Sequence, residues 1–253
     1  MEGVSAQAAP SIGADAVSQP EPTATPLPPP GKLMQSAEVI SLAEHAARRA
    51  EKLGTVIDGL EAGIAKRGED AAASAAAAGF PPGDQQSAAR KVTAKARTEV
   101  AANSEYARWG YIKELNAASE AVATTAALFA SPVAVLSRAG LGTPERTHYQ
   151  QQLEGSGIVE LRNMATLATA TGNKVLGAAL VSIIDQMPAR SRPISTAELA
   201  ERLVGEETRA VQEAVTRVKL ATQEALNRNR QFQTGRGNPL SRVKHALDMK
   251  EAQ

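Results

Sequence analysis

The sequence predicts an all-α protein, folded as an elongated helical bundle of long, heptad-patterned helices. Apolar residues recur at alternating steps of three and four, and no alternation of period two lasts long enough to indicate a strand. Hydrophobic residues make up 43% of the chain, yet only 3% of all residues are aromatic. Much of the remainder is alanine, which buries little area at about 25 cal/mol per Å², so we expect an extended body rather than a dense globule.

The first segment, residues 1–34, is expected to be a disordered, proline-rich tail. It holds seven of the 14 prolines and few large apolar residues, so burial cannot offset the entropy of ordering it. The run PLPPP also suits a polyproline II helix bound by an aromatic groove, but a solvated tether is the favoured interpretation. The amino terminus lacks a basic region followed by an apolar one, so we expect no cleaved secretory signal.

Residues 35–138 form the predicted long-helix region. Its first helix carries a heptad stripe, which is typical of a helix packed along one narrow seam. The stripe consists of Val39, Ala43, Ala46, Ala50, Leu53, Ile57, Leu60 and Ile64. Glycines inside it each cost up to about 1 kcal/mol relative to alanine, so the helix needs a partner helix from the same chain or from another copy. Gly79 and the following pair of prolines are expected to end it.

A second long helix is expected over residues 85–129. Tyr106 and Trp109 share one helical face and are expected to pack in the core, with an exposed interaction hot spot as the alternative. The uncharged run 121–137 is at the lower limit of length for a membrane span. Because it contains Pro132, a buried helical hairpin is favoured, and a membrane-active delivery protein is kept as a second alternative function.

Residues 139–187 are predicted to form a helical core segment. Thr143 is suited to cap its first helix, because a threonine hydroxyl accepts from free backbone NH groups and Pro144 is preorganised for the first helical position. Glycine-containing turns then divide the segment. The expected helices are 144–154, 157–171 and 174–187.

The last region, residues 188–253, is predicted to be tri-helical and helix-turn-helix-like, with a basic carboxyl-terminal tail. The stretch ISTAELAERL has the capped, leucine-flanked pattern of a first helix, although the glycine of the turn comes one residue late, at Gly205. The next helix begins with Glu206 and Glu207, where a DNA-reading helix needs lysine or arginine. A DNA-binding regulator using residues 173–247 is therefore the alternative function rather than the first.

The same region carries a packing seam and a basic run. Val204, Val211, Val218 and Ala225 recur at intervals of seven. Residues 226–247 contain no acidic residue, so we expect a docking element over 228–250, in which charge sets approach and aliphatic side chains hold a partner. A solvated helix end that folds back onto the body is the alternative. The expected partner-binding residues are Arg228, Arg230, Arg236, Leu240, Arg242, Val243, Lys244 and Leu247.

Motifs for catalysis, cofactors or metals are missing from the sequence. There is no cysteine, no glycine-rich phosphate loop and no nucleophile elbow. The three histidines are far apart, and the single pair Glu145-x-x-His148 falls short of the two such pairs and further carboxylates of a di-metal bundle. We therefore expect no enzymatic activity, no cofactor and no metal site.

The expected function is structural. The chain has the features of a non-enzymatic, scaffold-like protein that assembles through helix surfaces in a multi-copy particle, a build shared by analogy with virus or phage particle components. The expected partner is another copy of the chain or another assembly protein, with nucleic acid as a further partner of the basic run and no membrane. A formal net charge of +1 implies no overall attraction to polyanions. A cytoplasmic or virion location follows.

Overall fold

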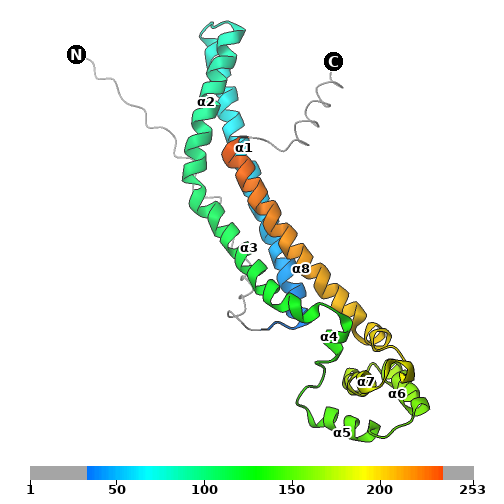
Figure 1. The fold of residues 1–253 in the computed structure, drawn as a ribbon. Helices are drawn as coiled ribbons and strands as arrows, with labels where there is room; N and C mark the ends of the chain where they lie inside the picture. Colours follow the sequence, from blue (N-terminus) through cyan, green and yellow to red (C-terminus); the bar gives the residue numbers. More distant parts are fainter. Residues whose placement is uncertain (1–32, 236–253) are drawn as a thin grey trace, which may run out of the picture.

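A computed structural model describes residues 33–235, and every regular element within that range is a helix. This confirms the predicted all-α class. Four helices form a long rod: α1 (Ser36–Ala77), α2 (Pro82–Asn103), α3 (Glu105–Ala126) and α8 (Thr196–Thr234). Figure 1 shows α1 and α8 side by side along the rod, with α2 and α3 following one another along its other side.

Contacts near the two ends of α1 show that α1 and α8 run parallel. The Glu207 carboxylate on α8 accepts a hydrogen bond from Ser36, the first residue of α1. Farther along both helices, Arg228 lies 3.9 Å from the carboxylate of Asp58. Residue numbers thus increase together on the two helices, so the same ends of both lie at the same end of the rod.

A buried arginine joins the start of α3 to the end of α8. Arg108 is 1% exposed, and its guanidinium donates to the side-chain oxygen of Asn229, the carbonyl of Ala101 and the hydroxyl of Ser104. The guanidinium also lies over the Phe232 ring, 4.8 Å from the ring centroid. Burial lowers the pKa of Arg108. Because the start of α3 meets the end of α8, these two helices run antiparallel.

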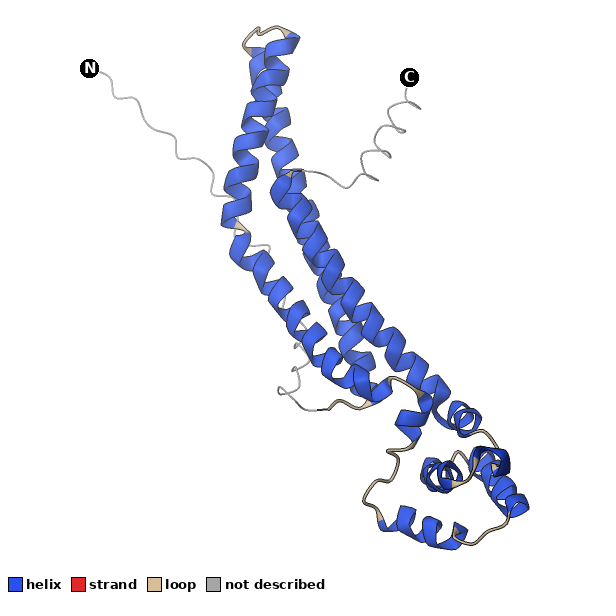
Figure 2. Cartoon of the chain, viewed as in Figure 1, coloured by secondary structure: helices blue, strands red, loops and turns tan. Residues whose placement is uncertain are grey.

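The remaining helices form a smaller terminal unit around the start of α8, which Figure 2 shows as short helices joined by loops. The unit encloses a second hydrophobic core, to which Leu136, Leu180 and Leu199 contribute fully buried side chains. Since α8 contributes to this core and to that of the rod, it connects the two. The elements are η2 (Ala127–Phe129), α4 (Pro132–Leu136), α5 (Pro144–Leu153), α6 (Ile158–Thr171), α7 (Lys174–Gln186) and η3 (Ala189–Ser191).

Several helix ends lie where the sequence predicted them. Gly79 follows α1 with a φ of +79°, a left-handed conformation that favours glycine, and Pro82 is the first residue of α2. The Thr143 hydroxyl accepts from the backbone NH of Arg146 at the start of α5, as expected of a cap. The three short helices predicted within residues 139–187 correspond to α5, α6 and α7.

The heptad stripe of α1 is buried as predicted, and its partner helices come from the same chain. Six of its eight residues are at most 4% exposed, and the other two, Ala50 and Leu60, are partly buried against the same core. The predicted seam of α8 is buried as well, from Val204 to Ala225. The helices α8, α2 and α3 all pack against α1.

The turn of the predicted helix-turn-helix is absent, and that prediction is wrong. The helix α8 runs without interruption through Gly205, so residues 196–234 form one helix of 39 residues. The buried seam continues across this glycine from Val204 to Val211. Burying the seam outweighs the cost of about 1 kcal/mol that one helical glycine adds. The rest of the predicted tri-helical region, residues 236–253, lies outside the described residues.

The core position expected for two aromatic residues is also wrong. Tyr106 is 92% exposed and Trp109 is 38% exposed. The buried face at this end of α3 is formed by Arg108, Ile112 and Leu115. Their spacing of four and three turns the two aromatic residues outward. In addition, the single helix expected over residues 85–129 is broken at Ser104 into α2 and α3.

The uncharged run 121–137 leads the chain from the rod into the terminal unit. It forms the end of α3, then η2 and α4, and it includes the fully buried residues Val122, Thr125 and Leu136. No helix within residues 33–235 is both long and apolar enough to cross a membrane. Most of the predicted amino-terminal tail lies outside the described residues, but at its end Met34 is buried and its NH donates to Thr125 Oγ1.

Candidate functional site

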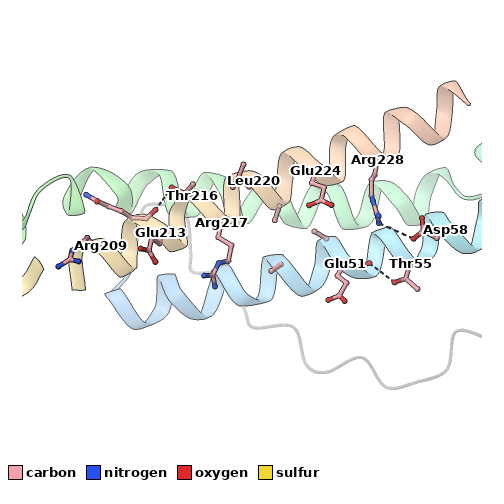
Figure 3. Close-up of a pocket in the computed structure, with 14 residues that line it drawn as sticks. Glu51, Thr55, Asp58, Arg209, Glu213, Thr216, Arg217, Leu220, Glu224 and Arg228 are labelled. Atoms are coloured by element: carbon pink, nitrogen blue, oxygen red, sulfur yellow. Dashed lines mark hydrogen bonds and ion pairs between the residues drawn. The ribbon is translucent and has the colours of Figure 1, made fainter. Parts of the chain in front are cut away.

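A groove lies between α1 and α8 on the surface of the rod. Figure 3 shows it from the side, with residues from both helices lining a cavity of about 910 Å³. A second cavity of about 590 Å³ continues it toward the end of α8, and the two share four lining residues. The shared residues are Asp58, Leu220, Glu224 and Arg228. Together the cavities form one groove along the two parallel helices.

One face of α8 supplies most of the charged wall of this groove, and we name it the α8 stripe. Its members are Arg209, Glu213, Arg217, Leu220, Glu224 and Arg228. They are spaced by four or three residues, so they occupy a sector of about 100° on the helix. The stripe lies beside the buried seam of the same helix, which fixes its orientation relative to the core.

The wall from α1 is lower and mostly made of small or acidic side chains. Ala47 and Ala50 line the groove, and Glu51, Thr55 and Asp58 follow them on α1, beside Glu224 and Arg228 in Figure 3. The parallel course of the two helices places the carboxylates of α1 beside the second half of the α8 stripe. The groove is therefore acidic toward one end and basic toward the other.

Some charged groups of the groove form ion pairs within residues 33–235 and others do not. Arg228 Nη1 lies 3.9 Å from Asp58 Oδ2, and Arg209 Nη2 lies 3.3 Å from the Glu201 carboxylate outside the groove. In the part of the chain that the structure describes, Arg217 and Glu224 form no ion pair. Exposed ion pairs of this kind stabilise the fold by only about 0–1 kcal/mol each. Exchanging them for ion pairs with a partner therefore costs little.

An uncovered apolar side chain lies in the middle of the groove. Leu220 is 59% exposed, although Val218 and Thr222, two residues away on either side, are buried. Polar residues would be expected at an exposed position midway along a solvated helix face. An exposed leucine flanked by opposite charges is a feature of interaction surfaces, in which an apolar centre is surrounded by a polar rim.

Of the eight predicted partner-binding residues, two lie within the described residues. Arg228 lines the groove, whereas Arg230 is exposed on α8 but does not line it. The other six lie outside the described residues, so the docking element over 228–250 stays a prediction for them. These six are Arg236, Leu240, Arg242, Val243, Lys244 and Leu247.

The basic residues of α8 are divided between the α8 stripe, which holds Arg209, Arg217 and Arg228, and positions outside the groove such as Lys219 and Arg230. Arg217 and Arg230 are about 20 Å apart along the helix at 1.5 Å per residue. Acidic residues, Glu213 and Glu224, alternate with arginines on the α8 stripe. Positive charge along the length of a groove favours a phosphate backbone, and these glutamates interrupt it.

The residues suited to metal binding are dispersed. Among residues 33–235 there is no group of three or more His, Asp or Glu side chains that could hold a metal ion. His148, from the pair singled out in the sequence, instead lies 3.0 Å from the side-chain amide of Gln152.

The period of the buried seam does not predict the α8 stripe, because the stripe lies on the face of the helix beside the seam. In the sequence, the stripe is visible as arginines and glutamates of α8 that follow one another at spacings of three and four residues. Comparisons with protein-family models, with curated proteins and with solved structures found no match to the chain.

Proposed function

We propose that this protein is a non-enzymatic structural component that assembles through its helix surfaces into a multi-copy particle. The observation that carries the proposal is the groove between α1 and α8, which has an exposed leucine at its centre and, within residues 33–235, charges of both signs without an ion-pair partner beside it. Such a surface is suited to a helical partner rather than to a small-molecule substrate, since it is open and elongated.

The helices of the rod are held together by several kinds of contact, which suits a structural role. Contacts other than the hydrophobic core join its helices, including Arg49 on α1, which lies 2.5 Å from the Glu114 carboxylate on α3 and over the Tyr111 ring. The Arg108 network joins α3 to α8. A groove supported on both sides by packed helices presents its side chains in a fixed arrangement, which lowers the entropy cost of binding.

The proposal is tested by size-exclusion chromatography with light scattering over a range of protein concentrations, with and without duplex DNA. We expect a mass that rises with concentration to a multiple of 26.4 kDa and that duplex DNA leaves unchanged. A monomeric mass at every concentration would contradict assembly from copies of the chain. A shift on addition of DNA would favour the DNA-binding alternative instead.

A further inference from the structure

We infer that the groove binds a second copy of this chain, antiparallel to the first, across a two-fold axis beside Leu220. The inference rests on the proposed function and specifies its partner. It starts from the order of side chains along the α8 stripe, where arginine and glutamate alternate on either side of the exposed leucine.

The order of charges is self-complementary in one antiparallel register. Arg217 and Glu224 lie equally far on opposite sides of the midpoint between Leu220 and Ala221, and the same is true of Glu213 and Arg228. In a two-fold interface, residues equally distant from the axis on opposite sides face each other. Arg217 therefore faces Glu224 of the second copy, and Glu213 faces Arg228 of the second copy. Because of the two-fold symmetry, each of these two contacts occurs twice in the dimer.

The wall from α1 adds to this complementarity. The half of the groove beyond the midpoint holds four carboxylates and one guanidinium, a formal charge of −3, from Glu51, Asp58, Glu61, Glu224 and Arg228. The half before it holds the other charged members of the α8 stripe, two arginines and one glutamate, a formal charge of +1. An antiparallel two-fold arrangement places the acidic half on the basic half, whereas a parallel arrangement places like on like.

The apolar centre lies on the same axis. In this register Leu220 of each copy meets Leu220 and Ala221 of the other, which covers a leucine that is 59% exposed in the single chain. The charged pairs then surround this contact on both sides. An apolar centre with a charged rim sets both affinity and register, because a shift of one helical turn would leave the leucines facing charges.

The test uses the full chain and charge reversal. Arg217→Glu places one glutamate opposite Glu224 of the other copy, and Glu224→Arg places an arginine opposite Arg217 of the other copy, so each variant creates a repulsion. By sedimentation at low salt, each variant should raise the dimer dissociation constant about tenfold or more. Combining both reversals in one chain restores opposite charges, so it should bring the constant back to within about threefold of the unaltered chain. An equimolar mixture of the two single variants should form a heterodimer.

The matched control is Lys219→Glu. It makes the same change of net charge on α8, at an exposed position outside the groove, and should leave the dissociation constant unchanged. Circular dichroism melts of every variant check that the rod still folds. Equal effects of Arg217→Glu and Lys219→Glu, or failure of the double reversal to rescue, would overturn the inference.

Three further outcomes bear on this inference and on the function it rests on. If the unaltered chain is multi-copy but none of the reversals changes its mass, the groove assignment is wrong while the proposed function stands. If the chain is monomeric at all concentrations, both are overturned. A dimer that forms only after removal of residues 236–253 would assign the groove to that segment and likewise overturn the inference.

Discussion

Replacing Arg108 by methionine tests whether the buried guanidinium stabilises the rod. Arg108 is nearly inaccessible, and its three hydrogen bonds go to Asn229, Ala101 and Ser104. Methionine retains a flexible apolar stem of similar length but donates no hydrogen bond. The change therefore leaves the Asn229 side-chain oxygen and the Ala101 carbonyl without this donor. The Ser104 hydroxyl keeps its own bond to a backbone carbonyl in α2.

The expected cost follows from these two acceptors. A buried acceptor that loses its donor costs about 1–3 kcal/mol, and because the Ala101 carbonyl is only half-buried the two together cost roughly 2–5 kcal/mol. Burying the charge of Arg108 costs desolvation free energy, and the same effect lowers its pKa. Removing the charge therefore offsets part of the loss in stability. We therefore expect Arg108→Met to lower the free energy of unfolding by about 2–4 kcal/mol.

The measurement is urea unfolding followed by circular dichroism. Adding Asn229→Leu to Arg108→Met removes one of the two stranded acceptors and should recover about half of the loss. Arg230→Met is the matched control, because this arginine is exposed on α8, and its effect should stay within about 0.5 kcal/mol. The reasoning is refuted if Arg108→Met is as stable as the unaltered chain, or if Asn229→Leu adds a further loss to it.

Three other changes test separate parts of the fold. Ile57→Asp places a carboxylate in the buried seam of α1 and should cost about 3–5 kcal/mol in urea unfolding; a loss below about 1 kcal/mol would contradict that burial. Hydrogen bonds from Lys174 and Ser36 lower the pKa of Glu207. Its stabilising contribution is therefore present above the unfolded pKa and lost as the pH falls through the folded one. Glu207→Gln should cost about 1 kcal/mol at neutral pH and nothing in strong acid, and melts that show an equal cost at both would refute this. Gly172→Ala forces alanine into a φ of +64° at the end of α6, and an unchanged melting temperature would contradict an expected cost of about 1 kcal/mol.

The buried seams could be predicted from the sequence because packing a long helix imposes a period. Each residue of the α1 stripe follows the last by three or four, and the residues of the α8 seam recur at intervals of seven. The ends of the short helices could be predicted as well, since capping depends on residues next to the helix itself. Thr143 and Asn173 both accept from backbone NH groups of the helix they begin.

Features decided by distant residues could not be predicted in this way. The chain is helical through Gly205 because the core of the rod and that of the terminal unit both need α8 as one continuous wall. Tyr106 is exposed because α3 turns Arg108 toward Asn229, a residue 121 positions away. The groove depends on α1 and α8 lying parallel, which the period of either helix alone does not determine.

Gly54 shows how one of these distant contacts accounts for a residue that is unfavourable locally. A glycine inside a helix costs about 1 kcal/mol relative to alanine, and α1 alone gives no reason for it. In the folded chain, the guanidinium of Arg228 crosses directly above Gly54 on its way to Asp58, and a Cβ at this position would collide with Arg228 Nη1. Because Gly54 has no side chain, Arg228, the last arginine of the α8 stripe, can pass close to the backbone of α1. Its charge stays inside the groove, where the antiparallel register requires it to face Glu213 of a second copy.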